Sequence, residues 1–152
     1  MNKYMEIALK DALNGVDNND GGPFGAVITD SLFNIVSTGH NMVLKNNDPT
    51  AHGEIVAIRN ACQKLKTNSL KGCTMYTTCE PCPMCLSAII WANIDKVYYA
   101  CNRSDAANIG FRDDDIYEYI KGNNKLIEMT EIDRDKCIKL MDDYKDMNKE
   151  MY

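Results

Sequence analysis

Apolar residues recur along the chain at helical and strand spacings, and this pattern predicts alternating helices and strands. Intervals of three and four residues predict amphipathic helices over 5–16, 55–65 and 137–147. Runs rich in β-branched and aromatic residues predict strands over 24–29, 32–38, 73–77, 96–101 and 126–132. Two more helices are expected over 82–93 and 116–120.

Turn-forming residues separate these predicted elements. Asp30-Ser31 predicts a hairpin between the first two strands, and Asp48-Pro49 predicts the start of a helix. Residues 102–112 are expected to form a loop. The strand-helix-strand order over 73–101 implies a parallel pair with a right-handed crossover. With 152 residues, the chain has the size of one domain, and we expect an α/β layered fold with helices on a mixed sheet.

The charge balance argues against a dedicated nucleic-acid partner. The chain has 17 basic and 22 acidic residues, a net charge of −5. Binding a polyanion normally requires a basic face, whereas acidic residues gather in the final third, at 113–115 and 142–143. A small neutral substrate fits this charge better than a tRNA or DNA strand.

Cysteine usage and the absence of long apolar runs predict a cytoplasmic protein. No run approaches the roughly 20 residues of a membrane span, and the first residues lack the apolar block of a secretion signal. The seven cysteines are an odd number, and we expect reduced thiols together with metal ligands. Four cysteines at apolar positions are expected to be small core residues: Cys62, Cys73, Cys101 and Cys137.

Two short motifs predict a zinc centre. His52-Gly53-Glu54 precedes a Pro-Cys-x-x-Cys motif at 81–85, and this combination is typical of zinc-dependent nucleobase deaminases. His52, Cys82 and Cys85 are the predicted ligands, which leave the fourth tetrahedral position for water, as a catalytic zinc requires. The cysteines are expected at a helix start, where the partial positive charge favours thiolates.

The remaining member of the motif, Glu54, is predicted to move protons. Zinc bound by one imidazole and two thiolates activates water for attack on a ring carbon that bears an amino group. Glu54 would take the proton from water and pass it to the ring nitrogen and the departing amine. A structural zinc site remains an alternative, because Cys79 or His40 is available as a fourth ligand.

At these residues the chain resembles the cytidine deaminase-like superfamily, and within it the short, zinc-binding bacterial guanine deaminases. The resemblance covers nearly the whole chain. The zinc motif marks only the superfamily, whereas later segments and the aromatic-ended tail favour the guanine deaminase branch. The segments that carry the resemblance are 22–28, 47–52, 80–85, 104–107, Gly110-Phe111 with the acidic residues after it, and 149–152.

The resemblance implies a three-layer α/β/α fold with a central five-stranded mixed sheet, one zinc ion per chain, and conversion of guanine to xanthine and ammonia. It also implies a homodimer in which a C-terminal segment, about residues 133–152, reaches over the partner's active site. Asn41 matches the asparagine that bonds the purine, and Asp113 matches the aspartate at the guanine edge. Phe24 matches a pocket aromatic residue, and Tyr152 matches the terminal tyrosine that closes the pocket.

Three positions depart from the family pattern. Gly53 replaces the usual alanine, and glycine inside a helix costs about 1 kcal/mol relative to alanine, which predicts a looser Glu54. Arg112 stands where an aspartate is expected, so Asp114 is an alternative to Asp113 as the guanine-facing carboxylate. The triplet 40–42 differs from the usual amide-rich one and leaves details of the purine contact open.

Other functions remain open from the sequence. The tRNA adenosine deaminases share both motifs, although a net charge of −5 argues against holding a loop of RNA through its phosphates. A cytosine or triazine deaminase would use the same zinc chemistry. A non-catalytic zinc-binding module would hold zinc without turnover, and replacing Glu54 would leave it unchanged.

Overall fold

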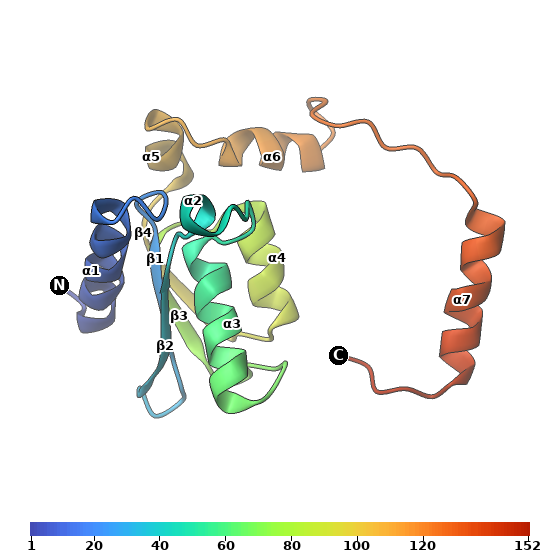
Figure 1. The fold of residues 1–152 in the computed structure, drawn as a ribbon, viewed down its shortest axis with the longest axis horizontal. Coiled ribbons are helices and arrows are strands. Elements are labelled where there is room, and N and C mark those ends of the chain that lie inside the picture. Colours follow the sequence, from blue (N-terminus) through green and yellow to red (C-terminus); the bar gives the residue numbers. More distant parts are fainter.

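The computed structural model describes residues 1–152 and has a four-stranded mixed sheet at its centre (Figure 1). The strand order is β2-β1-β3-β4. β1 is antiparallel to both neighbours, whereas β3 and β4 are parallel, so the predicted parallel pair is confirmed. The strands are β1 (Gly25–Thr29), β2 (Ile35–His40), β3 (Thr74–Cys79) and β4 (Lys96–Cys101).

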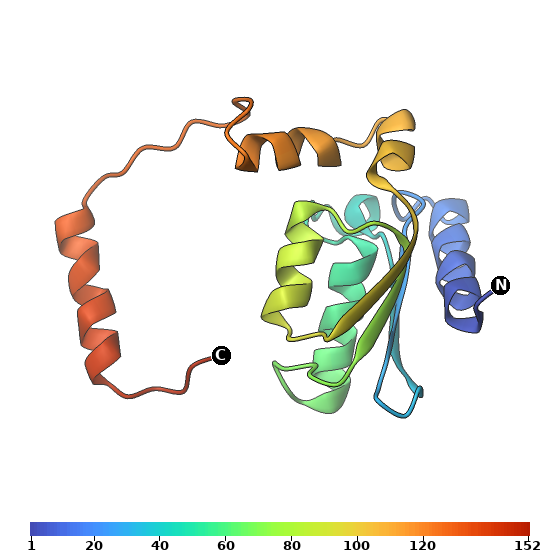
Figure 2. The same ribbon diagram turned by 180° about the vertical axis from the view of Figure 1, so that it is seen from behind.

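Helices cover both faces of this sheet (Figures 1 and 2). On one face, Tyr4 and Ala8 of α1 pack against Tyr76 of β3. On the other face, α3 and α4 bury a ten-residue apolar cluster around Met75. None of the helices combines the length and the apolar character that a membrane span requires. The helices are α1 (Lys3–Asp17), α2 (Val43–Asn46), α3 (Gly53–Leu65), α4 (Pro83–Trp91), α5 (Arg103–Asn108), α6 (Asp113–Ile120) and α7 (Arg134–Asp146).

The face of α1 that packs on the sheet is made mostly of small residues. The predicted apolar face included Ala8 and Ala12, which are buried, but its larger members Leu9, Leu13 and Val16 are exposed. A Cβ added to Gly25 of β1 would lie 2.2 Å from the carbonyl oxygen of Ala8, so the helix lies too close to the strand for large side chains to fit between them. The buried residues of α1 are Tyr4, Ala8, Ala12 and Gly15.

Two helix starts differ from the sequence prediction. Asp48-Pro49 does not begin a helix, because the Asp48 side chain instead accepts bonds from the backbone and hydroxyl of Thr50 and closes a turn. Helix α3 begins at Gly53, with His52 as its N-cap. Residues 103–108, predicted as loop, form α5 because Asn102 and Asp105 make a capping box.

The fifth strand predicted at 126–132 is absent, and the sheet has four strands rather than five. A strand forms only where a neighbouring strand pairs with it, and this segment instead runs away from the sheet (Figure 1). β4 is therefore left as an edge strand with mostly exposed residues.

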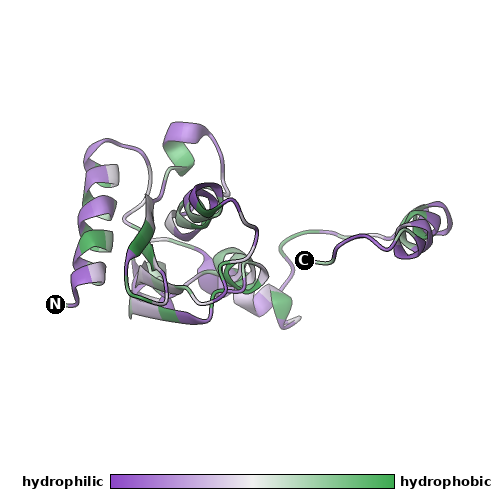
Figure 3. Ribbon diagram, turned by 90° about the horizontal axis from the view of Figure 1, so that it is seen from below, coloured by the Kyte–Doolittle hydropathy of each residue, from purple (hydrophilic) through white to green (hydrophobic).

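Residues 121–152, which we term the C-terminal arm, lie apart from the three layers. All of them are exposed except Ile138, which is half-buried. Helix α7 stands away from the body in every view, including the one from below (Figure 3). At its end the arm turns back toward the body, where the Tyr152 ring centroid lies 6.2 Å from that of Trp91 in α4.

The seven cysteines are all free thiols. Cys73 is buried and Cys62 packs partly buried against the core, as predicted. The prediction that Cys101 and Cys137 are core residues is wrong, because both are exposed. Cys101 lies on the open edge strand, and Cys137 lies on α7, away from the core.

Candidate active site

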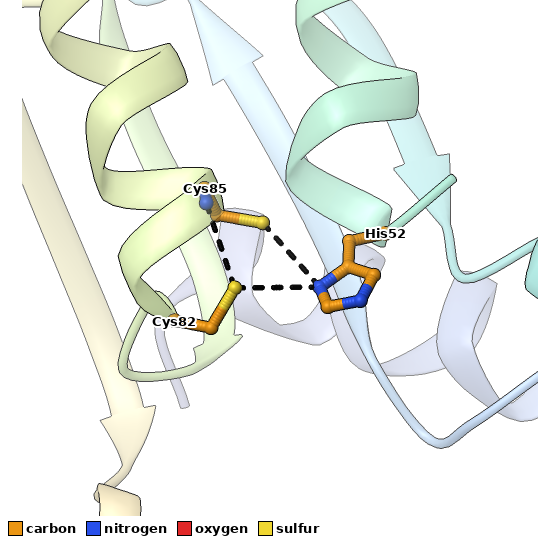
Figure 4. A group of neighbouring side chains, drawn as sticks. All are labelled: His52, Cys82 and Cys85. Carbon is orange, nitrogen blue, oxygen red and sulfur yellow. Dashed lines mark hydrogen bonds between the residues drawn. The ribbon is translucent and has the colours of Figure 1, made fainter. Parts of the chain in front are cut away.

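Three metal-binding side chains meet where α3 and α4 begin (Figure 4). His52 Nδ1 lies 3.5 Å from Cys82 Sγ and 3.5 Å from Cys85 Sγ. His52 is the N-cap of α3 and Cys82 is the N-cap of α4, with Cys85 in the first turn of that helix. The potential ligand atoms all lie within 4.8 Å of one another, so the structure brings the three predicted ligands together.

This geometry fits a zinc ion. Bonds of about 2.3 Å to sulfur and 2.0–2.1 Å to nitrogen place tetrahedral S and N ligands about 3.5 to 3.6 Å apart. Hydrogen bonds from Cys85 and then His52 lower the pKa of the Cys82 thiol. The hydrogen bond with Cys82, together with burial, raises the pKa of Cys85. Two adjacent thiolates repel each other, and a divalent cation between them allows both to ionise.

Neither alternative fourth ligand belongs to this group. Cys79 donates its thiol proton to the Asn102 carbonyl at 3.7 Å, and burial raises the pKa of Cys79 to about 12. The His40 ring is held between Asp11 and Asp20, at 3.0 and 2.8 Å. The group therefore has three protein members, the number found in catalytic rather than structural zinc sites.

Glu54 lies beside the three ligands but outside their group. Its side chain is buried, with 6% of the residue's surface exposed. Oε1 accepts a hydrogen bond from the Thr77 hydroxyl at 3.2 Å, and Oε2 accepts one from Cys85 Sγ at 3.4 Å. Burial raises the pKa of the Glu54 carboxyl. A buried, oriented carboxylate of this kind suits proton transfer.

Gly53 lets the first turn of α3 approach β1 closely. A Cβ added to Gly53 would lie 3.0 Å from the carbonyl oxygen of Phe24 and 3.3 Å from the Cα of Gly25. The next residue, Glu54, is buried and held by two hydrogen bonds. The structure therefore does not show the looser Glu54 side chain that the glycine at position 53 predicted.

A small cavity next to this group collects most of the predicted site residues. We call it the zinc cavity, and it has a volume of about 30 Å³. Cys85 is buried and does not line this cavity. Tyr152 is 81% exposed and does not reach the zinc cavity of its own chain. The lining residues are Phe24, Asn41, His52, Glu54, Cys79, Glu80, Cys82, Phe111 and Asp113.

Two aromatic side chains, Phe24 and Phe111, form part of the wall of the zinc cavity. The rings of Phe24 and Phe111 meet edge to face, with centroids 4.7 Å apart. A volume of 30 Å³ has room for about one or two water molecules, which is less than a purine base occupies. Gly110 precedes Phe111 with a φ of +99° and no atom near its Cβ position.

Asn41 is buried, with 3% of its surface exposed. Its backbone N–H donates to the Phe24 carbonyl at 2.9 Å, and its Oδ1 accepts from the Val43 N–H at 3.1 Å. A Cβ added to Gly21 would lie 2.1 Å from that oxygen, so only glycine fits against Asn41 here. With Oδ1 in use, the Asn41 NH₂ group is left to donate to a ligand.

Asp113, rather than Asp114, lines the zinc cavity. Asp113 is half-buried at the first position of α6, and burial raises the pKa of its carboxyl. Asp114 is exposed, and its Oδ1 lies 3.9 Å from Arg103 Nε. The register of the acidic run, which the sequence left open, is thus set by the orientation of the first turn of α6.

Three residues reach the site without a role assigned from the sequence: Thr77, Glu80 and Phe111. Glu80 and Phe111 stand within segments that resemble the family, so a signal for them existed. Thr77 is an ordinary strand residue in the sequence. Only the folded sheet shows that its hydroxyl lies beside Glu54.

The fold and the three-ligand group define an α/β protein of the zinc deaminase class. Residues 1–101 match the family model described as "Cytidine and deoxycytidylate deaminase zinc-binding region", and the chain belongs to this family. The superfamily resemblance and the α/β fold expected from the sequence are thereby confirmed.

Comparison with individual relatives adds detail. Guanine deaminase from Bacillus subtilis (strain 168) is 49% identical over 117 residues, which are 77% of this chain and 74% of the relative. A crystal structure of guanine deaminase from Bacillus subtilis aligns with a TM-score of 0.92 at 40% identity, covering 100% of this chain and 99% of that one. The tRNA-specific adenosine deaminase of Aquifex aeolicus (strain VF5) is 39% identical over 97 residues, 64% of this chain and 63% of the relative.

Proposed function

We propose that this chain is a zinc-dependent guanine deaminase that hydrolyses guanine to xanthine and ammonia. The observation that carries the proposal is the zinc cavity, where Glu54, Asn41 and Asp113 lie beside the three metal-binding side chains. The similarity to the guanine deaminase of Bacillus subtilis over 77% of the chain supports the choice of substrate.

We assign one zinc ion per chain to His52, Cys82 and Cys85. When bound, zinc supplies the Lewis acidity that makes water a nucleophile near neutral pH. We also propose a cytoplasmic location, because reducing conditions keep the two cysteine ligands available as thiolates.

Glu54 serves as the proton carrier in this scheme. Its carboxylate accepts one proton from the attacking water and donates it to the ring nitrogen, and then accepts the second proton of that water and donates it to the departing amino group. The hydrogen bond from Thr77 orients Oε1.

Asn41 and Asp113 recognise the base. Guanine presents N–H donors on its Watson–Crick edge, and the Asp113 carboxylate accepts from them, while the Asn41 NH₂ group donates to a ring acceptor. An analogue without those donors leaves the Asp113 acceptor unpaired, which in sites of this kind lowers turnover by roughly 10⁴-fold. Phe24 and Phe111 supply aromatic walls for the base.

The proposal includes a homodimer in which the C-terminal segment, about residues 133–152, reaches the partner's active site. Apolar side chains on the C-terminal arm and the open edge of β4 would otherwise face water, and exposed apolar surface of this extent marks an interaction site. Tyr152 lies outside the zinc cavity of its own chain, which leaves it free to close that of the other chain. The exposed apolar residues of the arm are Leu126, Ile127, Met129, Ile132, Leu140, Met141, Tyr144, Met147, Met151 and Tyr152.

A panel of substrates tests the proposed reaction. Ammonia release is measured with guanine, cytosine, adenine, an aminotriazine, the matching nucleosides and a tRNA anticodon stem-loop, with zinc determined on the same sample. We expect guanine to exceed every other substrate in kcat/KM by about 100-fold or more. Faster release from the tRNA stem-loop, cytosine or the triazine would assign the protein to that branch, and zinc without any turnover would make it a binding module.

A further inference from the structure

Helix α6 carries Asp113 but has little support from the body of the protein. None of its residues is buried, and it lies beyond the ends of α3 and α4 rather than within the three layers (Figures 1 and 2). Asp113 lines the zinc cavity only while α6 stays against the segment 80–85, which also carries Cys82 and Cys85. The contacts that hold α6 to that segment therefore decide whether the site is complete.

Arg103, the first residue of α5, contacts both sides of this junction. Its Nε lies 3.2 Å from Glu80 Oε1, and its backbone N–H donates to Glu80 Oε2 at 3.1 Å. Its guanidinium group lies over the Tyr117 ring of α6, 4.4 Å from the centroid. The Tyr117 hydroxyl in turn donates to the Pro81 carbonyl at 2.9 Å. One side chain thus joins the residue two positions before Cys82 to the helix that carries Asp113.

The chemistry of arginine suits this double contact. A planar guanidinium group can pair with a carboxylate along its edge and stack on an aromatic ring with its face, which the ammonium group of lysine cannot do. The Arg103 and Glu80 side chains are 36% and 25% exposed, so solvent weakens their attraction less than at an open surface. Asp114, 3.9 Å from Arg103 Nε, adds attraction from α6 itself.

We propose that Arg103 is a positioning residue of the deamination site, which fixes α6 against the segment before Cys82 and so holds Asp113 in the zinc cavity. The inference rests on the proposed function, since it concerns recognition of the same base. Arg103 is absent from the cavity lining and acts through Asp113.

Loss of the Arg103 contacts should reduce the fraction of molecules in which Asp113 faces the base. The apparent affinity for guanine falls in proportion to that fraction, whereas Glu54 and the three zinc ligands, on other elements, keep their positions. We expect Arg103→Met to raise KM for guanine about 10-fold, with kcat within about 2-fold of the wild type. Arg103→Lys keeps the charge without the stacking, and its KM for guanine should lie between those of the wild type and Arg103→Met.

A double-mutant cycle with the zinc-loaded enzyme separates positioning from a general loss of structure. If Arg103 acts through Asp113, Arg103→Met lowers kcat/KM much less in an Asp113→Asn background than in the wild type. Lys121→Met is the matched control, because it removes the basic side chain directly after α6, which pairs with Glu118 at 2.8 Å. An equal cost of Arg103→Met in both backgrounds would overturn the proposal.

Hydrogen exchange gives a second readout that does not depend on turnover. Amides of residues 113–120 should exchange faster in Arg103→Met than in the wild type or Lys121→Met, with zinc content unchanged. Tyr117→Phe, which loses only the bond to Pro81, should show a smaller increase of the same kind. Unchanged amide exchange in α6 would refute the proposal that Arg103 fixes this helix. If the wild type releases no ammonia from guanine, the proposed function fails, and the exchange measurement still decides the role of Arg103.

Discussion

Glu54 and Asp113 are two carboxylates that line one small cavity, and their surroundings separate their roles. Glu54 is buried, and the hydrogen bond from the Thr77 hydroxyl at 3.2 Å fixes the direction of its carboxylate. Asp113 is half-buried, and its pKa is raised by burial and by the neighbouring Cys82 charge, with no hydrogen bond from the protein contributing. The first is suited to proton transfer and the second to accepting hydrogen bonds from a ligand.

Replacing Glu54 with glutamine tests the first role. Glutamine keeps the size of the side chain and can still accept from Thr77, but it cannot carry the proton. We expect Glu54→Gln to retain zinc and thermal stability while kcat falls by about 10² to 10⁴-fold. Ammonia release and zinc content are measured together, with Glu118→Gln on α6, outside the lining of the zinc cavity, as the control. Normal turnover of Glu54→Gln would exclude Glu54 as the proton carrier.

Replacing Asp113 with asparagine tests the second role. The amide of asparagine places a donor where the guanine edge also has donors, and hydrogen bonds to charged groups contribute about 1.5 to 3 kcal/mol. We therefore expect Asp113→Asn to lower kcat/KM for guanine by about 100-fold, with little change in the unfolding midpoint. Asp114→Asn is the comparison variant and should lower kcat/KM for guanine much less, because Asp114 contributes only the longer contact with Arg103 at 3.9 Å. The opposite ranking of the two variants would transfer the role to Asp114.

At the residue scale, the sequence was enough to predict which side chains form the metal-binding group. It was not enough to predict the residues that hold the rest of the site in place. His52, Cys82 and Cys85 could be assigned because short spacings place each of them at a helix start. The choice between Asp113 and Asp114 depends on the orientation of α6, which no local spacing specifies. The Arg103–Glu80 pair joins residues far apart in the sequence, so only the folded chain shows it.

At the scale of elements, His40 connects four segments behind the site. Its ring bonds Asp11 of α1 and Asp20 of the following loop, and Asp20 also lies 3.4 Å from Lys45 of α2. His40 itself ends β2, next to Asn41. This polar cluster holds the loop that presses Gly21 against Asn41, so it supports one of the proposed substrate contacts.

Acid should weaken this connection. The hydrogen bond from His40 is the main reason that the pKa of Asp20 lies below its usual value. A carboxyl group whose pKa is lower in the folded state stabilises the fold above its unfolded pKa of about 3.9, and this contribution disappears as the pH falls through the folded value. We expect urea unfolding to show a loss of stability below about pH 4 that is smaller in His40→Ala. An equal loss of stability in both proteins would contradict the stabilising role of the His40–Asp20 hydrogen bond. Asp17→Asn, at an exposed position of α1, serves as the control.

The helices and strands predicted most accurately are those whose first and last residues are both marked in the sequence by turn or capping residues. Helix α4 and strand β4 lie within two residues of the ranges expected, because Pro83 marks the start of the helix and polar residues separate it from the strand. Helix α5 was missed because six residues are too few to show an apolar period, although its capping residues Asn102 and Asp105 were visible. Residues 126–132 have a strand-like pattern, but a strand also requires a partner, which sequence alone does not supply.

At the scale of the whole molecule, the C-terminal arm is the part that a single chain leaves uncovered. The three layers bury a shared core, whereas the arm exposes apolar side chains along most of its length. The resemblance implied that this segment belongs with a partner, and the proposed homodimer would cover these exposed side chains. Sequence patterns within one chain describe the apolar stripe of α7 without specifying what it packs against.

The proposed homodimer predicts a definite mass and a shared active site. Sedimentation at micromolar concentration should give twice the mass of the 17.1 kDa chain. A variant truncated before residue 133 should sediment as a smaller species, keep its zinc and lose guanine turnover, because the arm no longer closes the partner's cavity. A fully active monomer at the same concentration would refute the shared site.

The central claim is a zinc ion held by one imidazole and two thiolates, with water as the remaining ligand. X-ray absorption at the zinc edge on the purified protein tests it most directly. We predict one zinc per chain, with two sulfur neighbours at about 2.3 Å and two nitrogen or oxygen neighbours at about 2.0 to 2.2 Å. A third sulfur neighbour would place Cys79 on the metal, leave no position for water and contradict the hydrolytic mechanism.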